Sequence, residues 1–304
     1  MSVKHPVISV TGSSGAGTTS VKRTFERIFH RENVNAAYIE GDAFHRYDRM
    51  EMKRVMTEEA QKGNNHFSHF GPEANLLEEL ESIFRQFGED GTGKTRHYVH
   101  DDDEAEIYGS DPGTFTEWEP IPADTQVLFY EGLHGAVVTE DLNLAQHCDL
   151  KIGVVPVVNL EWIQKIFRDN LDRGYSHEVI KDTILRRMPD YLDYITPQFS
   201  ETDINFQRVP TVDTSNAFCA RWIPTPDESM VVIRFAKPKG IDFPYLTSMI
   251  KNSFMSRANS IVIPGGKMDL AMQLILTPMI LQLMERSRRA GGSRKNIQAI
   301  QKTA

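Results

Sequence analysis

The chain has 304 residues, of which 40% are hydrophobic and 25% charged, enough apolar material to bury the core of one large domain or two smaller ones. A formal net charge of −8 argues against a nucleic-acid partner, because binding a phosphate backbone requires a concentrated basic face. Cys148 and Cys219 form no C-x-x-C pair, so we expect two core residues rather than a disulfide or a thiolate metal site. We predict a cytoplasmic protein that acts on a small molecule and makes no membrane contact.

The first predicted strand leads into a glycine-rich segment. A β-rich run at 7–10 precedes GSSGAGTTS, and apolar residues at helical spacing follow it. This order is typical of a phosphate loop, whose backbone N–H groups cradle phosphates at the start of a helix. Thr18 stands where the usual lysine belongs, and Thr19 takes the hydroxyl position that ligates Mg²⁺. We therefore expect ATP to contact the whole loop, Gly12, Ser13, Ser14, Gly15, Ala16, Gly17, Thr18, Thr19 and Ser20.

The second predicted strand, 36–40, leaves two interpretations of this loop open. It ends in Glu40, the acid that a dinucleotide-type βαβ unit would use to bind a ribose. If the chain turns helical after Gly41, however, Asp42, His45 and Arg49 stack on one helix face. Such a set suits phosphoryl transfer to an alcohol that carries an anionic group, with Asp42 accepting the hydroxyl proton.

A second segment, GEDGTGKT at 88–95, matches the phosphate-loop pattern letter for letter. It follows an amphipathic helix that Gly88 is expected to cap, and no helix pattern comes after it, so we predict a solvent-exposed turn. Tyr98 and His100 then supply aromatic and imidazole groups that would suit a polyol, or would simply be solvated. Residues 101–125 are rich in Asp, Pro and Gly and are predicted to form a long functional loop or an insertion on the rim.

Two later strands bring an acid and several cations. The predicted strand 126–130 is followed by Glu131, which is placed to hold Mg²⁺. After the strand at 150–157, a helix at 159–175 separates an apolar side from a charged side. Ion pairs on a solvated face would look similar, but a mobile lid could supply the cation that the phosphate loop lacks. The apolar side comprises Leu160, Ile163, Ile166, Phe167 and Leu171, and the charged side Lys165, Arg168, Asp169, Asp172 and Arg173.

Together with a further strand at 230–235, these elements predict an α/β fold of the P-loop kinase type. We expect one domain over residues 1–286, with a mostly parallel central sheet and helices on both faces. The basic segment 287–304 is expected to be disordered. Several aromatic residues could lie either in the core or against sister subunits, namely Trp222, Phe243, Tyr245 and Phe254.

Seven segments resemble the phosphoribulokinases of the short, proteobacterial type, over about residues 3–286. They are GSSGAGTTS, IEGDAFHRYDR, YVHDDDEA, LFYEGLHGAV, NLEWIQKIFRD, TPQFSETDINFQRVP and DFPYLTSMI. A phosphate loop without lysine is itself a feature of that group. The resemblance implies ATP- and Mg²⁺-dependent phosphorylation of D-ribulose 5-phosphate to ribulose 1,5-bisphosphate in the Calvin cycle.

The resemblance also implies roles for individual residues. Asp42 matches the general base and Glu131 the metal-binding acid. The lid residues are Lys165, Arg168 and Asp169, and the sugar phosphate would be bound by His45, Arg49, Tyr98, His100 and Arg173. Members of this type are octamers that NADH activates and AMP inhibits, and the NADH response would involve Arg31, Arg234 and Arg257. Thioredoxin control is not expected, because Ala16 stands where plant-type relatives carry a loop cysteine.

Other functions remain compatible with the sequence. A uridine- or pantothenate-type kinase would keep the phosphate loop, Asp42 and the lid, but would have less use for His45 and Arg49. A phosphoribulokinase-like paralogue could act on another substrate. A non-catalytic regulator could use the phosphate loop only to sense nucleotide.

Overall fold

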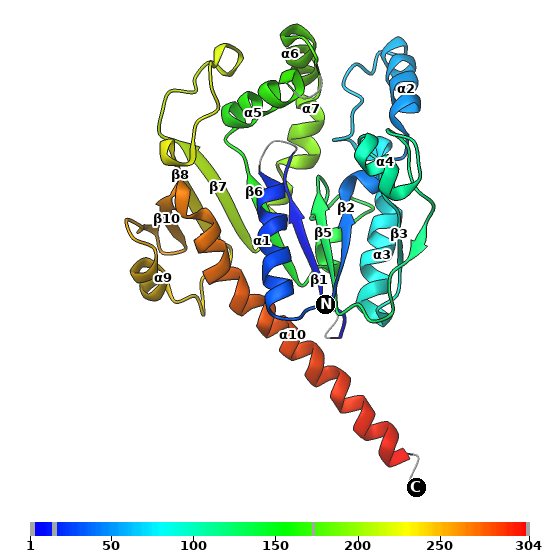
Figure 1. Cartoon of the computed structure of the whole chain (residues 1–304), viewed down its shortest axis with the longest axis vertical. Helices are drawn as coiled ribbons and strands as arrows, with labels where there is room; N and C mark the ends of the chain where they lie inside the picture. Colours follow the sequence, from blue (N-terminus) through cyan, green and yellow to red (C-terminus); the bar gives the residue numbers. More distant parts are fainter. Residues whose placement is uncertain (1–3, 14–16, 172–173, 302–304) are drawn as a thin grey trace.

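The computed structural model describes residues 4–13, 17–171 and 174–301; for Thr19 and residues 291–301 it describes the backbone alone. An eight-stranded sheet runs through the molecule in the order β2-β5-β1-β6-β7-β8-β10-β9 (Figure 1). Its strands are β1 (Val7–Thr11), β2 (Ala36–Glu40), β5 (Val127–Gly132), β6 (Leu150–Val155), β7 (Ile204–Pro210), β8 (Ser229–Phe235), β9 (Phe254–Arg257) and β10 (Ser260–Pro264). The five predicted strands are confirmed, with ends that differ by at most two residues.

The sheet has a parallel half and an antiparallel half. Strands β2, β5, β1, β6 and β7 pair in parallel, while β8, β10 and β9 continue the sheet as antiparallel neighbours. The prediction of a mostly parallel sheet is therefore confirmed for the half that carries the phosphate loop. Since the carboxyl ends of its strands meet at one edge, that edge collects the segments that follow β1, β2, β5 and β6.

Helices cover both faces of the parallel half. On one face, α1 (Thr18–Arg31) and α10 (Met268–Gln301) pack on a core that includes Ile8 and Val10 of β1, and α9 (Phe243–Met249) joins the same core beside β9 of the antiparallel half. On the other face, α3 (Leu77–Asp90) packs on a core that includes Val7, Leu128 and Tyr130. Because β1 is fully buried on both sides, its carboxyl end is a rigid base for the loop that follows.

Helix α10 extends well below the sheet in Figure 1. It runs through Pro278 to Gln301, so the segment after residue 286 is helical over its described length. Disorder of residues 287–304 in solution stays a prediction. Within the described ranges, no helix combines the length and the apolar character needed to cross a bilayer.

The second phosphate-loop match is a turn, as predicted. Helix α3 does not end at Gly88, which lies inside it; its C-cap is Gly91, in the left-handed conformation with φ 81°. The predicted cap residue is wrong because the helix buries Phe87 and Gly88 and continues through two more exposed residues, Glu89 and Asp90. Lys94 then begins the short strand β3 (Lys94–Thr95), with its ammonium 5.3 Å from the Trp118 ring, and no helix follows.

The predicted rim loop at 101–125 contains regular structure. It begins with α4 (Asp102–Tyr108), which Asp101 caps by accepting a hydrogen bond from the Glu104 N–H at 3.0 Å. Strand β4 (Glu119–Pro120) then pairs with β3. An N-cap aspartate and acids in the first turn stabilise this helix locally, and the functional role of the rim segment stays a prediction.

The predicted lid helix is α5 (Val158–Leu171), which packs against α6 (His177–Arg186). Leu160, Ile163 and Ile166 are buried as expected, but Leu171, also placed on the apolar side, is 75% exposed. Asp169, placed on the solvated side, is buried. The helix wheel fails at Leu171 because α5 ends there, and at Asp169 because Lys165 and Arg168 of the same helix bond to its carboxylate.

Candidate active site

The phosphate loop leaves β1 at Gly12 and enters α1 at Thr18. The Gly12 N–H donates to the Gly132 carbonyl at 3.2 Å, which joins the ends of β1 and β5. A Cβ at Gly12 would lie 2.9 Å from the Val154 carbonyl oxygen, so no other residue fits without a shift. Gly17 has φ 100°, a conformation that glycine adopts without strain. Ser14, Gly15 and Ala16 lie outside the described residues.

The acid at the end of β5 lies where the sequence predicted it. Glu131 pairs in register with Glu40 of β2, so two carboxylates stand side by side. Burial raises the pKa of the Glu131 carboxyl, and Asp42 and Glu40 raise it further, although a hydrogen bond with Thr18 and the charge of Lys22 act in the opposite direction. Clustered oxygen anions of this kind call for a cation, which is the environment that Mg²⁺ prefers.

These carboxylates fit a magnesium ion that phosphates share. The described residues contain no group of three or more His, Cys, Asp or Glu side chains arranged as a metal cage. Mg²⁺ is commonly held by one or two carboxylates together with water and substrate phosphates. Glu131 and the hydroxyl that the sequence places at Thr19 would hold it here.

Lys22 was missed by the sequence interpretation. It lies one helical turn beyond Thr18 and its ammonium is 2.5 Å from the Glu40 carboxylate. The charge of Glu131 also raises the pKa of Lys22. A cation is therefore present near the phosphate loop, on α1 rather than within the loop itself. The i, i+4 spacing from Thr18 is the signal that could have revealed it.

The acceptor side is built around Asp42. This residue lies in a 3₁₀ turn, η1 (Gly41–Phe44), that follows β2. The His45 Nε2 atom is 3.5 Å from its Oδ1 atom, and the His100 Nε2 atom is 3.7 Å from its Oδ2 atom. The Tyr98 ring lies 4.9 Å from the His100 ring and 6.0 Å from the His45 ring. Four of the predicted residues thus converge.

Arg49 reaches this cluster by another route than predicted. The chain does not form one helix from Asp42 to Arg49. The turn η1 ends at Phe44, an extended stretch follows, and α2 (Arg49–Gln61) begins after it with Asp48 as its N-cap. The Arg49 guanidinium donates to the His100 carbonyl at 2.7 Å. The tertiary fold therefore brings Arg49 and Asp42 together through the 98–100 segment, whereas the sequence pattern predicted that they stack on one helix.

His45 is buried, although an isolated histidine at this position would more often lie on the surface. Its ring stacks on His69 at 3.8 Å. Burial lowers the pKa of His45, with Arg187 and Arg96 adding to the effect and Asp42 opposing it. His69 and His134 were missed by the sequence interpretation; burial likewise lowers the pKa of both, to about 4 for His134. A neutral imidazole cluster therefore lies behind Asp42.

The lid cations lie around one carboxylate. Lys165 and Arg168 both donate to Asp169, the latter through two nitrogens at 3.0 and 2.8 Å. Burial acts to raise the pKa of Asp169, but the two cations outweigh it and lower that pKa. Asp169 thus holds both cations in one orientation. Arg173, the third predicted cation, lies outside the described residues.

The three arginines of the expected NADH response do not meet within one chain. Arg31, at the end of α1, donates to Thr277 of α10 at 2.9 Å. Side chains of β8 alternate between the two faces of the sheet, and the neighbours of Arg234, Ile233 and Phe235, lie in the core on the face that α1 covers. Arg234 therefore points to the other face. It pairs in register with Ser260, which in turn pairs with Arg257. Arg234 and Arg257 thus lie on the two strands that flank Ser260 of β10.

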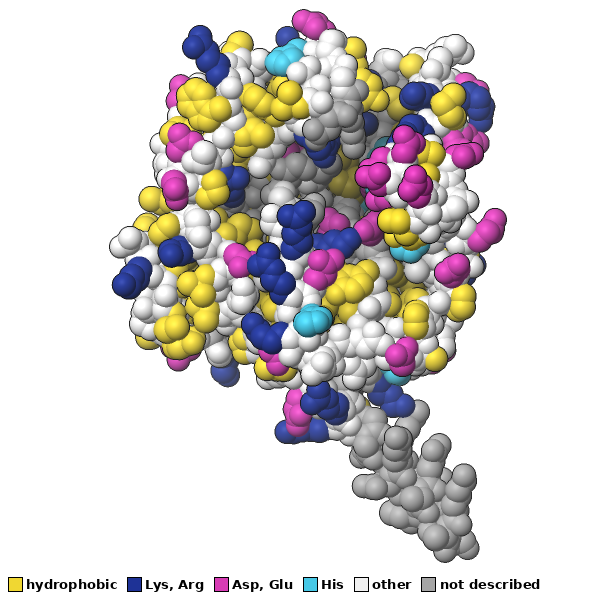
Figure 2. Space-filling model, in the orientation of Figure 1, with side chains coloured by type: hydrophobic (Ala, Val, Ile, Leu, Met, Phe, Trp, Pro, Cys, Tyr) yellow, Lys and Arg dark blue, Asp and Glu magenta, His cyan; other side chains and the backbone are white. Residues whose placement is uncertain are grey.

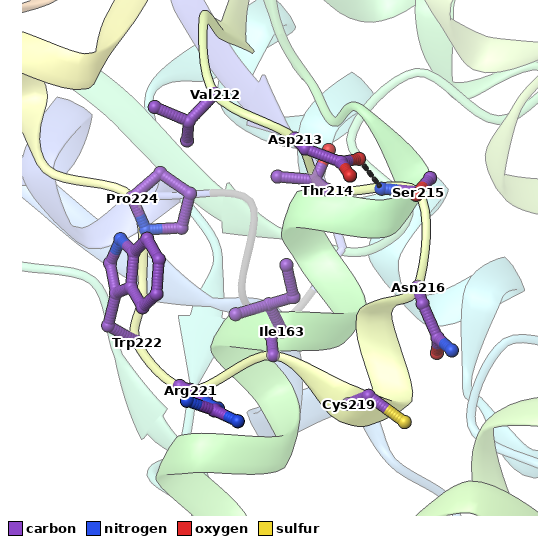
Figure 3. A pocket seen from close by; sticks show the side chains of 11 residues that line it. Ile163, Val212, Asp213, Thr214, Ser215, Asn216, Cys219, Arg221, Trp222 and Pro224 are labelled. Atoms are coloured by element: carbon purple, nitrogen blue, oxygen red, sulfur yellow. Dashed lines mark hydrogen bonds between the residues drawn. The ribbon is translucent and has the colours of Figure 1, made fainter.

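A cavity of about 400 Å³ lies between α5 and the segment that follows β7 (Figure 3). Ile163 forms its floor, Trp222 and Pro224 one wall, and Asp213 and Asn216 contribute polar groups. Cys219 lines it and is exposed, so the expectation that both cysteines are core residues holds only for Cys148. Since β7 runs parallel to β6, this cavity lies at the same edge of the sheet as the phosphate loop.

The surface agrees with these positions. In Figure 2 the face that carries α1 is hollowed at its centre, and basic and acidic side chains both border the hollow. A glycine-rich loop between β1 and α1, a strand-terminal acid and a basic helix beyond β6 together define a P-loop kinase.

Comparison with known proteins places the chain further. A family profile described as "Phosphoribulokinase / Uridine kinase family" matches residues 7–215. The chain is 73% identical over 287 residues to a phosphoribulokinase of Nitrobacter vulgaris, and the aligned part covers 94% of this chain and 99% of the relative. Identity with a phosphoribulokinase of Xanthobacter flavus is 72% over 291 residues, covering 96% and 100%. A solved phosphoribulokinase from Rhodobacter spheroides superposes with a TM-score of 0.87 at 61% identity, covering 94% of this chain and 100% of that one.

The chain therefore belongs to the phosphoribulokinase / uridine kinase family. It is a kinase of the phosphoribulokinase type, and the resemblance to proteobacterial members is confirmed.

Proposed function

We propose that the chain transfers the γ-phosphoryl group of ATP to a hydroxyl of D-ribulose 5-phosphate, giving ribulose 1,5-bisphosphate for the Calvin cycle. The observation that carries this proposal is the position of Asp42. Its carboxylate lies between His45 and His100, next to the strand whose end carries Glu131. A carboxylate that can accept a proton, with imidazole groups beside it, suits an acceptor that has both a hydroxyl and a phosphate.

In this mechanism the acceptor side does proton work and positioning. Asp42 accepts the proton of the attacking hydroxyl, while Arg49, His100 and Tyr98 hold the phosphate at the other end of the sugar. His45 is neutral without substrate, because burial lowers its pKa. A neutral imidazole can donate a hydrogen bond to the sugar and leaves the Asp42 charge free to act as base.

The ATP side provides charge stabilisation. The N–H groups at the start of α1 contact the phosphates, and Mg²⁺, when bound, neutralises charge that builds up on them. Lys165 and Arg168 come from above on α5 and stabilise the transferring group, with Asp169 fixing their direction. Placing a cation on a helix that can approach late favours transfer to the sugar over transfer to water.

The nucleoside half of ATP would lie on the opposite side of the loop from Asp42. Strands β2 and β5 flank β1 on the acceptor side, and β6 and β7 flank it on the other. The cavity beside Ile163 and Trp222 offers a volume of about 400 Å³ there, within the usual range for small-molecule sites. Binding of ADP should quench tryptophan fluorescence, and Trp222→Phe should abolish most of that quenching. If the variant is quenched as strongly as the wild type, the adenine ring binds elsewhere.

The relatives also suggest regulation and assembly. From the resemblance to the proteobacterial type, we extend to this chain an octameric state, activation by NADH through Arg31, Arg234 and Arg257, inhibition by AMP, and a cytoplasmic location. Since Arg31 and Arg234 point to opposite faces of the sheet in one chain, an NADH site that uses all three arginines would need more than one subunit.

The experiment that tests the function is Asp42→Asn, assayed with ATP and D-ribulose 5-phosphate. Loss of the base should lower kcat by about 10²- to 10⁴-fold and leave ATP affinity, measured by calorimetry, nearly unchanged. Asp141→Asn, an exposed position before the 3₁₀ turn Leu144–His147, is the matched control and should keep full activity. Near-normal turnover by Asp42→Asn would refute this mechanism. Inactivity of the wild type towards D-ribulose 5-phosphate would refute the assignment of this sugar as the substrate.

A further inference from the structure

Glu161 is a buried carboxylate that the catalytic scheme does not use. It lies in the first turn of α5 and is only 5% exposed. The Ser13 hydroxyl, in the phosphate loop, donates to its Oε1 atom at 2.5 Å. The Tyr191 hydroxyl donates to its Oε2 atom at 3.0 Å. Both carboxylate oxygens are therefore engaged, each by a different segment of the chain.

Two of the three segments joined in this way, the phosphate loop and the lid helix, are those that cooperate in the proposed phosphoryl transfer. Ser13 directly follows Gly12, the first glycine of the phosphate loop. Glu161 precedes Lys165 by one helical turn, so it shares a face of α5 with that cation. Tyr191 begins a π-helical turn, Tyr191–Ile195, which lies beyond α6, and its ring contacts the partly buried ring of Phe70. The carboxylate is thus a direct link between the ATP loop and the base of the lid.

Burying a carboxylate here carries a cost that packing alone does not explain. Desolvation raises the pKa of Glu161 to about 6, and the Ser13 and Tyr191 hydrogen bonds and the Lys165 charge only partly offset it. The titratable groups that face Glu161 are Lys165 on its own helix and Tyr191, whose own pKa is raised by burial and by Glu161. A glutamine of the same shape would avoid the desolvation of a charge.

We propose that Glu161 is a positioning residue which, in its ionised form, ties the phosphate loop to the lid helix and so aims Lys165 and Arg168 at the phosphates of ATP. This inference rests on the proposed function. An ionised carboxylate accepts from both hydroxyls at once, whereas a protonated one must donate through one oxygen, so that one of the two hydroxyls has to turn away. Protonation therefore weakens the link.

The sign of the stability effect separates this role from a purely structural one. Since the folded-state pKa of Glu161 lies above the ordinary value of 4.5, its contribution to stability is present below pH 4.5 and is lost as pH rises through about 6. At pH 8 the ionised side chain costs stability. Glu161→Gln should then have the same melting temperature as the wild type or a higher one, although its activity is lower.

The experiment compares the full-length wild type with Glu161→Gln. We expect kcat/KM for ATP to fall by about 10- to 100-fold and the acid limb of its pH profile near pH 6 to disappear, with KM for the sugar phosphate little changed. ADP affinity, measured by calorimetry, should lose its dependence on pH between 5.5 and 7.5. Glu178→Gln, an exposed acid at the start of α6, is the matched control and should retain both pH profiles.

Two further variants test the link itself. Tyr191→Phe and Ser13→Ala each remove one hydrogen bond, and combining either with Glu161→Gln should add little to the single effect, because the partners act as a unit. Additive losses would overturn the proposal, as would a Glu161→Gln enzyme with a wild-type acid limb. A melting temperature at pH 8 that falls in step with activity would also overturn it. The ADP measurements need no sugar, so they remain informative even if ribulose 5-phosphate proves not to be the substrate.

Discussion

Lys165 shows, at the scale of single residues, how a neighbour decides what a side chain can do. Its ammonium donates a hydrogen bond to Asp169 and interacts electrostatically with Arg187 and Arg168. Burial lowers the pKa of Lys165 to about 8, with the two arginines adding to the effect and Asp169 opposing it. The cation that we propose as the replacement for the missing loop lysine therefore loses its charge at only mildly alkaline pH.

This predicts the alkaline side of the pH profile. If Lys165 acts as a cation, kcat should fall as pH rises through about 8, because the group deprotonates there. Lys165→Arg keeps the charge at all accessible pH values, so its kcat, although lower, should stay flat to higher pH. Steady-state kinetics from pH 7 to 9.5 at saturating ATP check this. An unchanged alkaline limb in the arginine variant would assign that limb to another group.

Residue types alone could identify part of the acceptor site. Asp42, His45, Arg49, Tyr98 and His100 were found from their chemistry and from the resemblance, and the described structure brings them together. His69, His134 and Glu161 carry no pattern in the sequence, because each is made significant by partners more than twenty residues away, such as the His45 ring and the Ser13 hydroxyl. No local spacing could have predicted those contacts.

At the scale of elements, the lid depends on a small core of its own. Ile166 of α5 packs with Ile180 and Ile184 of α6, separately from the two large cores of the sheet. The position of Lys165 and Arg168 therefore depends on a few apolar contacts. Small satellite cores of this kind unfold locally at lower free energy than the main core, which suits the movement that we propose for the lid.

Truncating this core should loosen the lid. Ile184→Ala removes a buried side chain and should lower the free energy of lid unfolding by about 2–4 kcal/mol, with faster amide exchange in α5 and α6 and a raised KM for ATP. Leu185→Ala, one residue later and 47% exposed, is the matched control; its effect should stay within about 0.5 kcal/mol. Hydrogen exchange followed by mass spectrometry distinguishes the two. Equal protection in both variants would show that the lid is held elsewhere.

Elements also explain why one phosphate-loop match has the structural context for binding phosphate and the other does not. GSSGAGTTS departs from the pattern at Thr18, yet it joins a buried strand to a helix. GEDGTGKT fits the pattern, yet it spans the exposed end of α3 and a two-residue strand. Phosphate binding requires aligned N–H groups at a helix start, and only the first segment supplies them.

At the scale of the whole molecule, the antiparallel half of the sheet leaves apolar side chains uncovered. Strand β9 forms the edge of the sheet and all four of its residues are exposed, Phe254 at 52%. Tyr245 and Met249 of α9 are 47% exposed, and Met230 of β8 is 42% exposed. Of the aromatic residues considered from the sequence, Phe243 instead packs on Phe235 at 5.5 Å. An exposed edge strand with aromatic residues is a surface on which copies of a chain can pair.

A charge at this edge should reduce the size of the assembly. Phe254→Glu introduces like charges where two copies would meet, so sedimentation velocity should show smaller species than the wild type at the same concentration. Glu119→Gln, at an exposed position of β4 outside the main sheet, serves as control and should sediment like the wild type. A wild-type sedimentation coefficient for Phe254→Glu would place the subunit contacts on another face.

The sequence by itself determined the parallel half of the sheet, the phosphate loop and the chemical identity of the site, because strand periodicity, glycine spacing and unusual motifs are local properties of the chain. The tertiary structure decided the rest. It replaced the expected helix through Asp42 and Arg49 by a turn and a hydrogen bond to His100, buried Asp169 between two cations, and placed Glu161 between Ser13 and Tyr191. Each of these depends on which distant segments share the carboxyl edge of the sheet, and that arrangement is fixed only when the whole core packs.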